Sequence, residues 1–171
     1  EEVKDLNIFR RMIEVNYLGA VNGLHFALPH LKQSRGHMVA IASIQSKIGV
    51  PYHTGYVASK HALEGFCRAL RYDLEGTGVT VLTVHPHWIR GTNLRTNACS
   101  ADDQPVGDRK LAHTGESIST AECSAAILKA IGNRDTELIV PAKLRFVPWL
   151  KLLWPGLLRR KIWSKINRQE N

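Results

Sequence analysis

The sequence predicts an α/β fold built on a parallel sheet, from two short apolar runs and a helical segment between them. Residues 38–42 (MVAIA) are typical of a buried strand, and residues 79–84 (VTVLTV) form a second, β-rich run. Between them, residues 56–76 carry apolar side chains at helical spacing and end in the sequence EGTG, a typical glycine stop. A helix that joins two such strands is a crossover connection, so the two strands are expected to run parallel.

Further elements are expected on both sides of this unit. Residues 6–32 carry apolar side chains at roughly helical spacing, which predicts a long helical region. Residues 138–141 indicate a third, shorter strand, and residues 120–131 a helix before it. Either Ser119 or Thr120 is expected to cap that helix.

Composition is that of an ordinary globular domain. The 171 residues are 44% hydrophobic and 22% charged, enough for one domain with a real core. No run of eighteen apolar residues occurs, and the acidic start EEVKD argues against a signal peptide. Cys67, Cys99 and Cys123 lack CxxC spacing, so neither a disulfide framework nor a zinc site is indicated. We therefore expect a cytoplasmic protein.

The positive charge lies mostly in a tail, residues 142–171, which we separate from the domain formed by residues 1–141. Residues 141–171 contain eight Lys and Arg residues and one Glu. They therefore account for most of the net charge of +8 of the whole chain. Three of the four Trp residues lie there too, and Pro148 and Pro155 divide the tail into short predicted helices.

Three interpretations of the tail stay open. In the first, the tail is an interfacial segment that meets a membrane surface. In the second, its apolar face covers the substrate cleft or a subunit partner while its bases stay solvated. Nucleic-acid binding fits less well, because the density of Trp and Leu exceeds what a phosphate-tracking arm needs. The residues expected to enter a lipid boundary are Trp149, Leu153, Trp154, Leu158 and Trp163.

The chemistry-bearing residues cluster around the first strand and the helix after it. Ser43 follows the first strand, and Tyr56 and Lys60 have the i, i+4 spacing that puts them on one helix face. A phenol, with a reference pKa near ~10, is a poor acid or base at neutral pH, and a neighbouring ammonium lowers that pKa. Such a pair is suited to general acid or base catalysis, and the Ser hydroxyl can hold a substrate oxygen.

Ser43 and the sequence YVASK, residues 56–60, resemble the active-site segment of the short-chain dehydrogenase/reductase family. The resemblance runs from about Leu6 to Pro141, with Asn16 (in VNYLG) and Pro86 in matching contexts. It implies a Rossmann-like doubly wound parallel sheet, whose N-terminal strands and Gly-rich cofactor turn are missing from this sequence. It also implies NAD or NADP as cofactor and a homodimer or homotetramer.

The resemblance implies an oxidoreductase that interconverts a secondary alcohol and a ketone. By analogy, Tyr56 moves the hydroxyl proton and Ser43 hydrogen-bonds the carbonyl oxygen. Lys60 lowers the Tyr56 pKa and binds the nicotinamide ribose together with Tyr56. Asn16 interrupts its helix and positions a water molecule for proton relay. The apolar, Trp-bearing tail favours a hydrophobic substrate.

A second group of implied cofactor contacts follows the second strand, in PHWIRGT, residues 86–92. Pro86 matches the family, Ile89 stands where the backbone binds the carboxamide, and Thr92 is displaced by one residue. His87 replaces a Gly that permits close backbone approach. His87 and Trp88 are also candidates for substrate contact.

The loop of residues 44–55 is expected to border the substrate, with Gln45, Tyr52 and His53 as candidate contacts. The polar segment 92–117 is expected to form a lid. His85 and His87 suggest a metal pair only weakly, because no further ligands cluster nearby in the sequence, so we expect none.

A non-catalytic alternative also fits these residues. In it the chain is a truncated dehydrogenase remnant whose basic tail docks a membrane or a partner. The missing Gly-rich turn and His87 are the features that favour this hypothesis.

Overall fold

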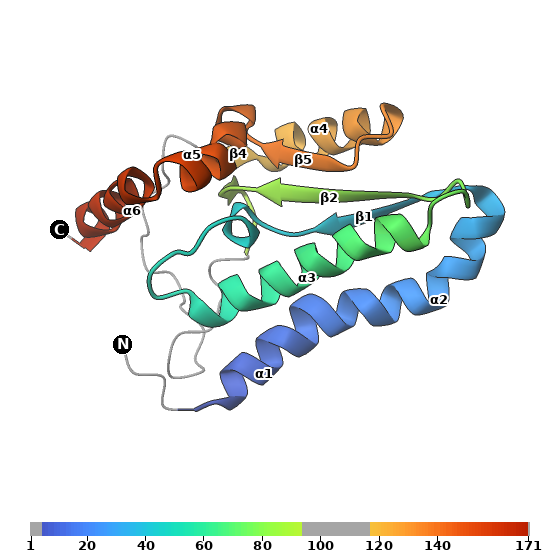
Figure 1. Ribbon diagram of the computed structural model, residues 1–171, viewed down its shortest axis with the longest axis horizontal. Helices are drawn as coiled ribbons and strands as arrows, with labels where there is room; N and C mark the ends of the chain where they lie inside the picture. The colour runs from blue at the N-terminus through green and yellow to red at the C-terminus, as the bar shows by residue number, and fades with distance from the viewer. Residues whose placement is uncertain (1–4, 94–116, 171) are drawn as a thin grey trace.

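The computed structural model describes residues 5–93 and 117–170. It contains a three-stranded parallel sheet with helices on both faces (Figure 1). The expected doubly wound α/β architecture is therefore confirmed. The elements in chain order are α1 (Asn7–Ile13), a π-helix (Glu14–Leu18), α2 (Gly19–Ser34), β1 (His37–Ile41), a 3-10 turn (Ile44–Ser46), α3 (Thr54–Asp73), β2 (Thr80–Pro86), β3 (Ile89–Arg90), β4 (Ile118–Ser119), α4 (Thr120–Gly132), β5 (Glu137–Val140), a 3-10 helix (Ala142–Phe146), α5 (Val147–Leu153) and α6 (Pro155–Glu170).

The sheet has the order β1-β2-β5, and all its strands run parallel. β2 is the central strand, and its burial is continuous from Val81 to Pro86, as both faces of a parallel sheet require. β1 and β5 are the two edges. β3 and β4 form a separate two-stranded parallel pair, which the sequence did not predict because each strand has only two residues.

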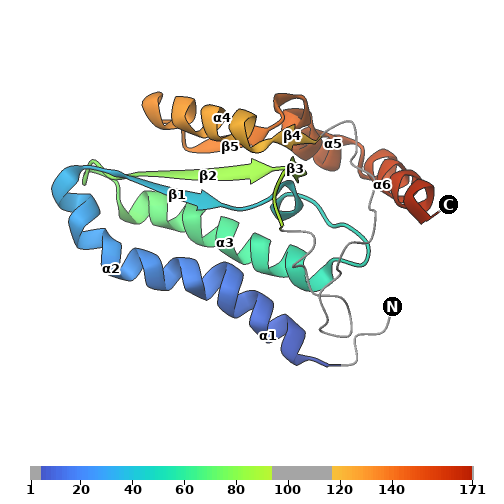
Figure 2. The ribbon, with the colours of Figure 1, turned by 180° about the vertical axis from the view of Figure 1, so that it is seen from behind.

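Two apolar clusters fill the space on either face of the sheet. One lies between β1, β2 and the helices α2 and α3, with Leu63, Cys67 and Leu70 of α3 at its centre. The other lies between β2, β5 and α4, where Leu82 and Val84 contact α4 residues such as Cys123. Seen from either side, α4 covers one face and α2 and α3 cover the other (Figure 2).

Several element ends follow from local sequence. The long helical region ends where Arg35 adopts the left-handed conformation, and Gly36 follows it. Helix α3 begins at Thr54, two residues before the expected start, so Tyr56 lies in its first turn. Ser119 caps α4 in a reciprocal capping box with Glu122. Cys67 and Cys123 are free thiols in the buried core. Most of the expected lid lies outside the described residues.

Candidate active site

Ser43 and Tyr56 meet at the carboxyl end of the sheet. Ser43 is buried two residues after β1, where its hydroxyl accepts a hydrogen bond from the Gln45 backbone at 3.2 Å. Helix α3 brings Tyr56 to the same place, near enough for the Ser43 side chain to influence the pKa of the phenol. The structure thus brings together an alcohol and a phenol from segments thirteen residues apart.

Lys60 lies one turn further along α3, on the same side as Tyr56. Its Nζ is 5.7 Å from the centroid of the Tyr56 ring and donates a hydrogen bond of 3.0 Å to the carbonyl of Ile41, the last residue of β1. The ammonium is therefore held at the strand end, beside the phenol ring. Ser43, Tyr56 and Lys60 converge as their spacing suggested.

Two influences act in opposite directions on the pKa of Tyr56. Burial raises it, which is the larger effect, and the hydrogen bond with Ser43 lowers it. Burial also lowers the pKa of Lys60. The role expected for Lys60, to lower the Tyr56 pKa, stays a prediction; in this structure its ammonium donates to the Ile41 carbonyl. Tyr56 is therefore a protonated phenol at neutral pH, able to donate.

Asn16 lies in the π-helix that separates α1 from α2. Such local widenings of a helix are frequent at functional sites, and the expected interruption at Asn16 is present. Its Nδ2 donates to Ser59 Oγ at 3.0 Å, and that hydroxyl donates to the Tyr56 carbonyl at 2.8 Å. Asn16 thus connects its helix to the first turn of α3. Asn16, Ile41 and Lys60 also line a groove of about 460 Å³.

The segment after β2 is shaped by main-chain contacts. The His87 amide donates to the Val140 carbonyl at 2.8 Å, which extends the pairing of β2 with β5 past Pro86. The His87 ring accepts from the Trp88 amide at 2.7 Å, so it is turned back toward its own chain. Ile89 pairs with β4 and packs on the second apolar cluster, and Thr92 Oγ1 donates weakly to the Ile89 carbonyl at 3.4 Å.

The candidate substrate residues of the loop after Ser43 fall into two groups. Gln45 and His53 lie together, with Oε1 of the amide 3.0 Å from Nδ1 of the ring. Tyr52 has a positive φ of 63° and is exposed, and its ring contacts Trp163 of α6 edge-on, at 6.2 Å between centroids. The structure therefore joins Tyr52 to the tail and keeps Gln45 and His53 nearer to Ser43.

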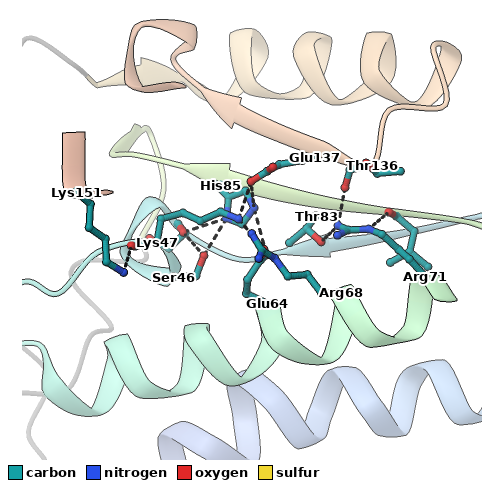
Figure 3. A network of polar contacts seen from close by, with 12 residues as sticks. Ser46, Lys47, Glu64, Arg68, Arg71, Thr83, His85, Thr136, Glu137 and Lys151 are labelled. Atoms are coloured by element: carbon teal, nitrogen blue, oxygen red, sulfur yellow. Dashed lines mark hydrogen bonds and ion pairs between the residues drawn. The ribbon is translucent and has the colours of Figure 1, made fainter. Parts of the chain in front are cut away.

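Sequence reasoning missed an ion cluster near this site, formed by the buried side chains of Lys47, Glu64 and His85 and the exposed carboxylate of Glu137 (Figure 3). Lys47 Nζ lies 2.5 Å from Glu64 Oε1 and 2.6 Å from Glu137 Oε1. His85 Nε2 lies 3.3 Å from a carboxylate oxygen of each Glu. One signal was present in the sequence, because Glu64 lies four residues after Lys60 and so shares its helix face.

The cluster contacts the segment that carries Ser43. His85 Nδ1 is 2.9 Å from Ser46 Oγ and 3.2 Å from the Ser43 carbonyl, and Ser46 Oγ donates to that carbonyl at 2.7 Å. Among the described residues, Glu64, His85 and Glu137 have the spacing of metal ligands. The Lys47 ammonium already lies between the two carboxylates and Arg68 adds a second positive charge at Glu64, so the cluster is better suited to holding the Ser43 turn.

The pKa directions agree with a compact ion cluster. Burial is the largest influence on the pKa of Glu64 and raises it, but hydrogen bonds from Lys47 and Arg68 and the charge of Lys47 together outweigh it, so the net shift is downward. Burial is the largest influence on His85 and lowers its pKa, helped by the Lys47 charge. His85 is therefore held as a neutral ring near pH 7.

Comparisons with known proteins agree with this geometry. A family model described as short chain dehydrogenase matches residues 1–103. Dehydrogenase/reductase SDR family member 7B of Mus musculus is 32% identical over 169 residues, which cover 96% of this chain and 51% of that protein. The chain thus spans about half the length of this relative.

Two solved structures show the same fold. A short chain dehydrogenase from Burkholderia cenocepacia, solved with NADP, aligns with a TM-score of 0.74 at 22% identity and covers 93% of this chain and 60% of its own. An alcohol dehydrogenase from the archaeon Thermococcus sibiricus, complexed with 5-hydroxy-NADP, aligns with a TM-score of 0.59 at 25% identity. That alignment covers 80% of this chain and 54% of the dehydrogenase. Because the family model matches more than half of its residues, this chain belongs to the short chain dehydrogenase family.

Proposed function

We propose that the protein is an NAD(P)-dependent oxidoreductase that interconverts a secondary alcohol and a ketone of hydrophobic character. The observation that carries the proposal is the convergence of Ser43, Tyr56 and Lys60 at the carboxyl end of a parallel sheet. Ligands of open α/β sheets bind at this end of the strands. The Thermococcus sibiricus relative, complexed with 5-hydroxy-NADP, supports a nicotinamide cofactor.

Each of the three side chains has one role in this proposal. Tyr56, whose pKa burial raises, donates its proton to the substrate oxygen in reduction and takes it back in oxidation. Ser43 holds that oxygen by a hydrogen bond. Lys60, fixed by the Ile41 carbonyl, offers its remaining N–H groups to the ribose hydroxyls of the cofactor. The nicotinamide, when bound, supplies or accepts the hydride.

The residues present fit the nicotinamide end of such a cofactor. Lys60 Nζ, held at the carboxyl end of β1 by the Ile41 carbonyl, keeps N–H groups for the nicotinamide ribose. The pyrophosphate end needs a Gly-rich turn at a helix N-terminus, and residues 1–171 contain none before Asn16. We infer that a further part of the protein supplies it, because the chain spans about half the length of its relatives.

The free edge of β1 is the place where that part fits. β1 pairs only with β2 among the described strands, and apolar side chains of α2, such as Leu24 and Leu31, line the groove beside its free edge. An unpaired strand edge next to an apolar groove is a template for another parallel strand. Ile41, at the end of β1, is half exposed here and becomes buried once that strand is added.

The test is the Tyr56→Phe variant of the full-length protein, assayed by the absorbance of NADPH or NADH with hydrophobic ketones and secondary alcohols. We expect turnover to fall by at least ~100-fold, as for removal of a general acid, with an unchanged melting temperature. Tyr72→Phe is the matched control, since Tyr72 lies on the same helix and is exposed. Near-normal turnover of Tyr56→Phe refutes the assignment.

The non-catalytic alternative has a separate readout. His87 stands where the family usually has a Gly, and a side chain there restricts close approach of a cofactor to the backbone. If the full-length wild-type protein does not bind NADH or NADPH in a fluorescence titration, the remnant hypothesis replaces the enzyme. If the wild-type protein binds the cofactor and the Tyr56→Phe variant keeps its turnover, only the role of Tyr56 is contradicted.

A further inference from the structure

The C-terminal helices α5 and α6 have one apolar side that packs on the domain. Leu158 and Ile162, one turn apart on α6, are partly buried and line a small hollow with Ile48 and Pro51 of the loop after Ser43. Lys151 of α5 donates to the Lys47 carbonyl at 2.9 Å. These contacts fix the tail beside the loop that borders the candidate active site. They account for only part of its apolar side chains.

A second set of apolar side chains in the tail is exposed. Five large ones fall within nine residues and are between 56% and 74% exposed: Phe146, Trp149, Leu152, Leu153 and Trp154. We call this set the outer apolar face. Exposed large apolar residues elsewhere, such as Tyr72 and Leu128, are scattered along the chain. A cluster of this kind marks an interaction surface.

The charge around the outer apolar face has one sign. Within residues 141–171 the only acidic residue is Glu170, at the far end of α6. The basic residues of this segment are Lys143 and Arg145 before the face, Lys151 within its span, and Arg159, Arg160, Lys161, Lys165 and Arg168 after it. Tryptophan rings among Lys and Arg are typical of a segment that lies at a membrane–water boundary. An anionic surface is complementary to this charge.

The face also lies away from the sheet edge that we expect to be extended. α5 and α6 follow β5, the edge strand opposite β1 in the order β1-β2-β5, and they project beyond the end of the sheet (Figures 1 and 2). A strand added at β1 therefore joins the sheet at the edge opposite to the strand that leads into α5 and α6. No helix among the described residues is long and apolar enough to span a bilayer.

We propose that the outer apolar face binds the surface of an anionic lipid bilayer, with its Trp and Leu side chains in the acyl boundary and the flanking bases on the headgroups. The helices lie in the plane of the interface rather than across it. This contact brings the loop after Ser43 near the lipid, because Lys151 of α5 donates to the Lys47 carbonyl of that loop. The proposal does not depend on catalysis, so Tyr56→Phe is expected to bind vesicles like the wild type.

The first test is flotation of the full-length protein with vesicles of phosphatidylcholine, with and without phosphatidylserine. We expect Trp149→Gln with Leu152→Gln to weaken binding at least about tenfold, since two interfacial anchors are lost. The matched control is Tyr72→Gln with Leu128→Gln, the same residue classes at 80% and 69% exposure on other helices, which should bind like the wild type.

A second variant pair tests the charge. Arg159→Gln with Arg160→Gln should weaken binding roughly thirtyfold on vesicles that contain phosphatidylserine, at ~1 kcal/mol per base, and little on phosphatidylcholine alone. Lys32→Gln with Lys129→Gln removes the same charge from α2 and α4 and is expected to change neither.

A local probe keeps the test independent of any other membrane contact of the protein. In a Cys99→Ser background, where Cys67 and Cys123 are buried, an environment-sensitive dye is attached to Leu153→Cys or, as control, Leu128→Cys. We expect a blue shift and quenching by nitroxide-labelled lipids for the first position and neither for the second.

Three outcomes overturn the proposal. The first is an equal response of the dye at positions 153 and 128, which contradicts lipid contact at position 153. The second is that the Trp149→Gln, Leu152→Gln variant binds vesicles like the wild type but no longer forms a dimer in sedimentation equilibrium. That result assigns the outer apolar face to contact with a second copy of the protein. A fall of several degrees in melting temperature, again with unchanged vesicle binding, shows that the rest of the protein covers it.

Discussion

Removal of the Lys47 ammonium should destabilise the protein more than any surface ion pair does. Lys47 and Glu64 have side chains that are 7% and 8% exposed, and their Nζ and Oε1 atoms lie 2.5 Å apart. Breaking such a buried pair from one side leaves an uncompensated charge and costs ~3–5 kcal/mol. In Lys47→Met, Arg68 still contacts Glu64 at 2.7 Å, so we expect the lower end, about 3 kcal/mol less free energy of unfolding.

The measurement is urea denaturation of the full-length protein, with the slope on denaturant compared between variants. Arg68→Gln is the control, because this side chain is 62% exposed and an exposed pair contributes at most ~1 kcal/mol. Lys47→Met combined with Glu64→Gln should be less destabilised than the sum of the single variants, since no charge is left unpaired between them. A loss below about 1 kcal/mol for Lys47→Met, or strict additivity, would refute the buried pair.

Two further predictions concern pH and packing. Folding lowers the pKa of His85, mainly by burial. Below about pH 6.5 the unfolded chain therefore binds a proton that the folded chain does not. The free energy of unfolding is thus expected to fall as the pH falls. His85→Asn should flatten that decrease between about pH 6.5 and 5 in urea titrations, and an unchanged slope would contradict the assignment. A Cβ at Gly55 would lie 2.8 Å from Met12 Sδ, so Gly55→Ala should cost about 1–3 kcal/mol, whereas Gly65→Ala, with nothing within 4 Å, should stabilise α3 by about 0.5–1 kcal/mol. Thermal unfolding compares the two, and equal effects would contradict the close approach of α1 to α3.

The local part of the fold was accessible from sequence because it depends on near neighbours. The apolar runs gave β1 and β2, and the reciprocal contact of Ser119 with Glu122 fixed the start of α4 as expected. Pro148 and Pro155 lie at the starts of α5 and α6, where proline is tolerated. The β3–β4 pair was missed because its two-residue strands have no periodicity to detect.

The candidate site divides in the same way. The spacing of Tyr56 and Lys60 on one helix face is a property of any helix, so the sequence was enough to place them together. The sequence was not enough to predict whether the pKa of Tyr56 is raised or lowered. That shift depends on how much of the ring is buried and on which atom the Lys60 ammonium contacts. Both depend on packing between segments far apart in the chain.

The sequence by itself determined the period of the main helices and strands and the parallel crossover, and it singled out three side chains as candidates for catalysis. Only the tertiary structure decided that Lys47, Glu64, His85 and Glu137 meet in one cluster beneath Ser43, because they come from a loop, a helix and two strands. It also decided which side of the tail packs on the domain. Contacts within a turn are set by backbone geometry, whereas contacts across the sheet exist only after the chain has paid the entropy of bringing those segments together.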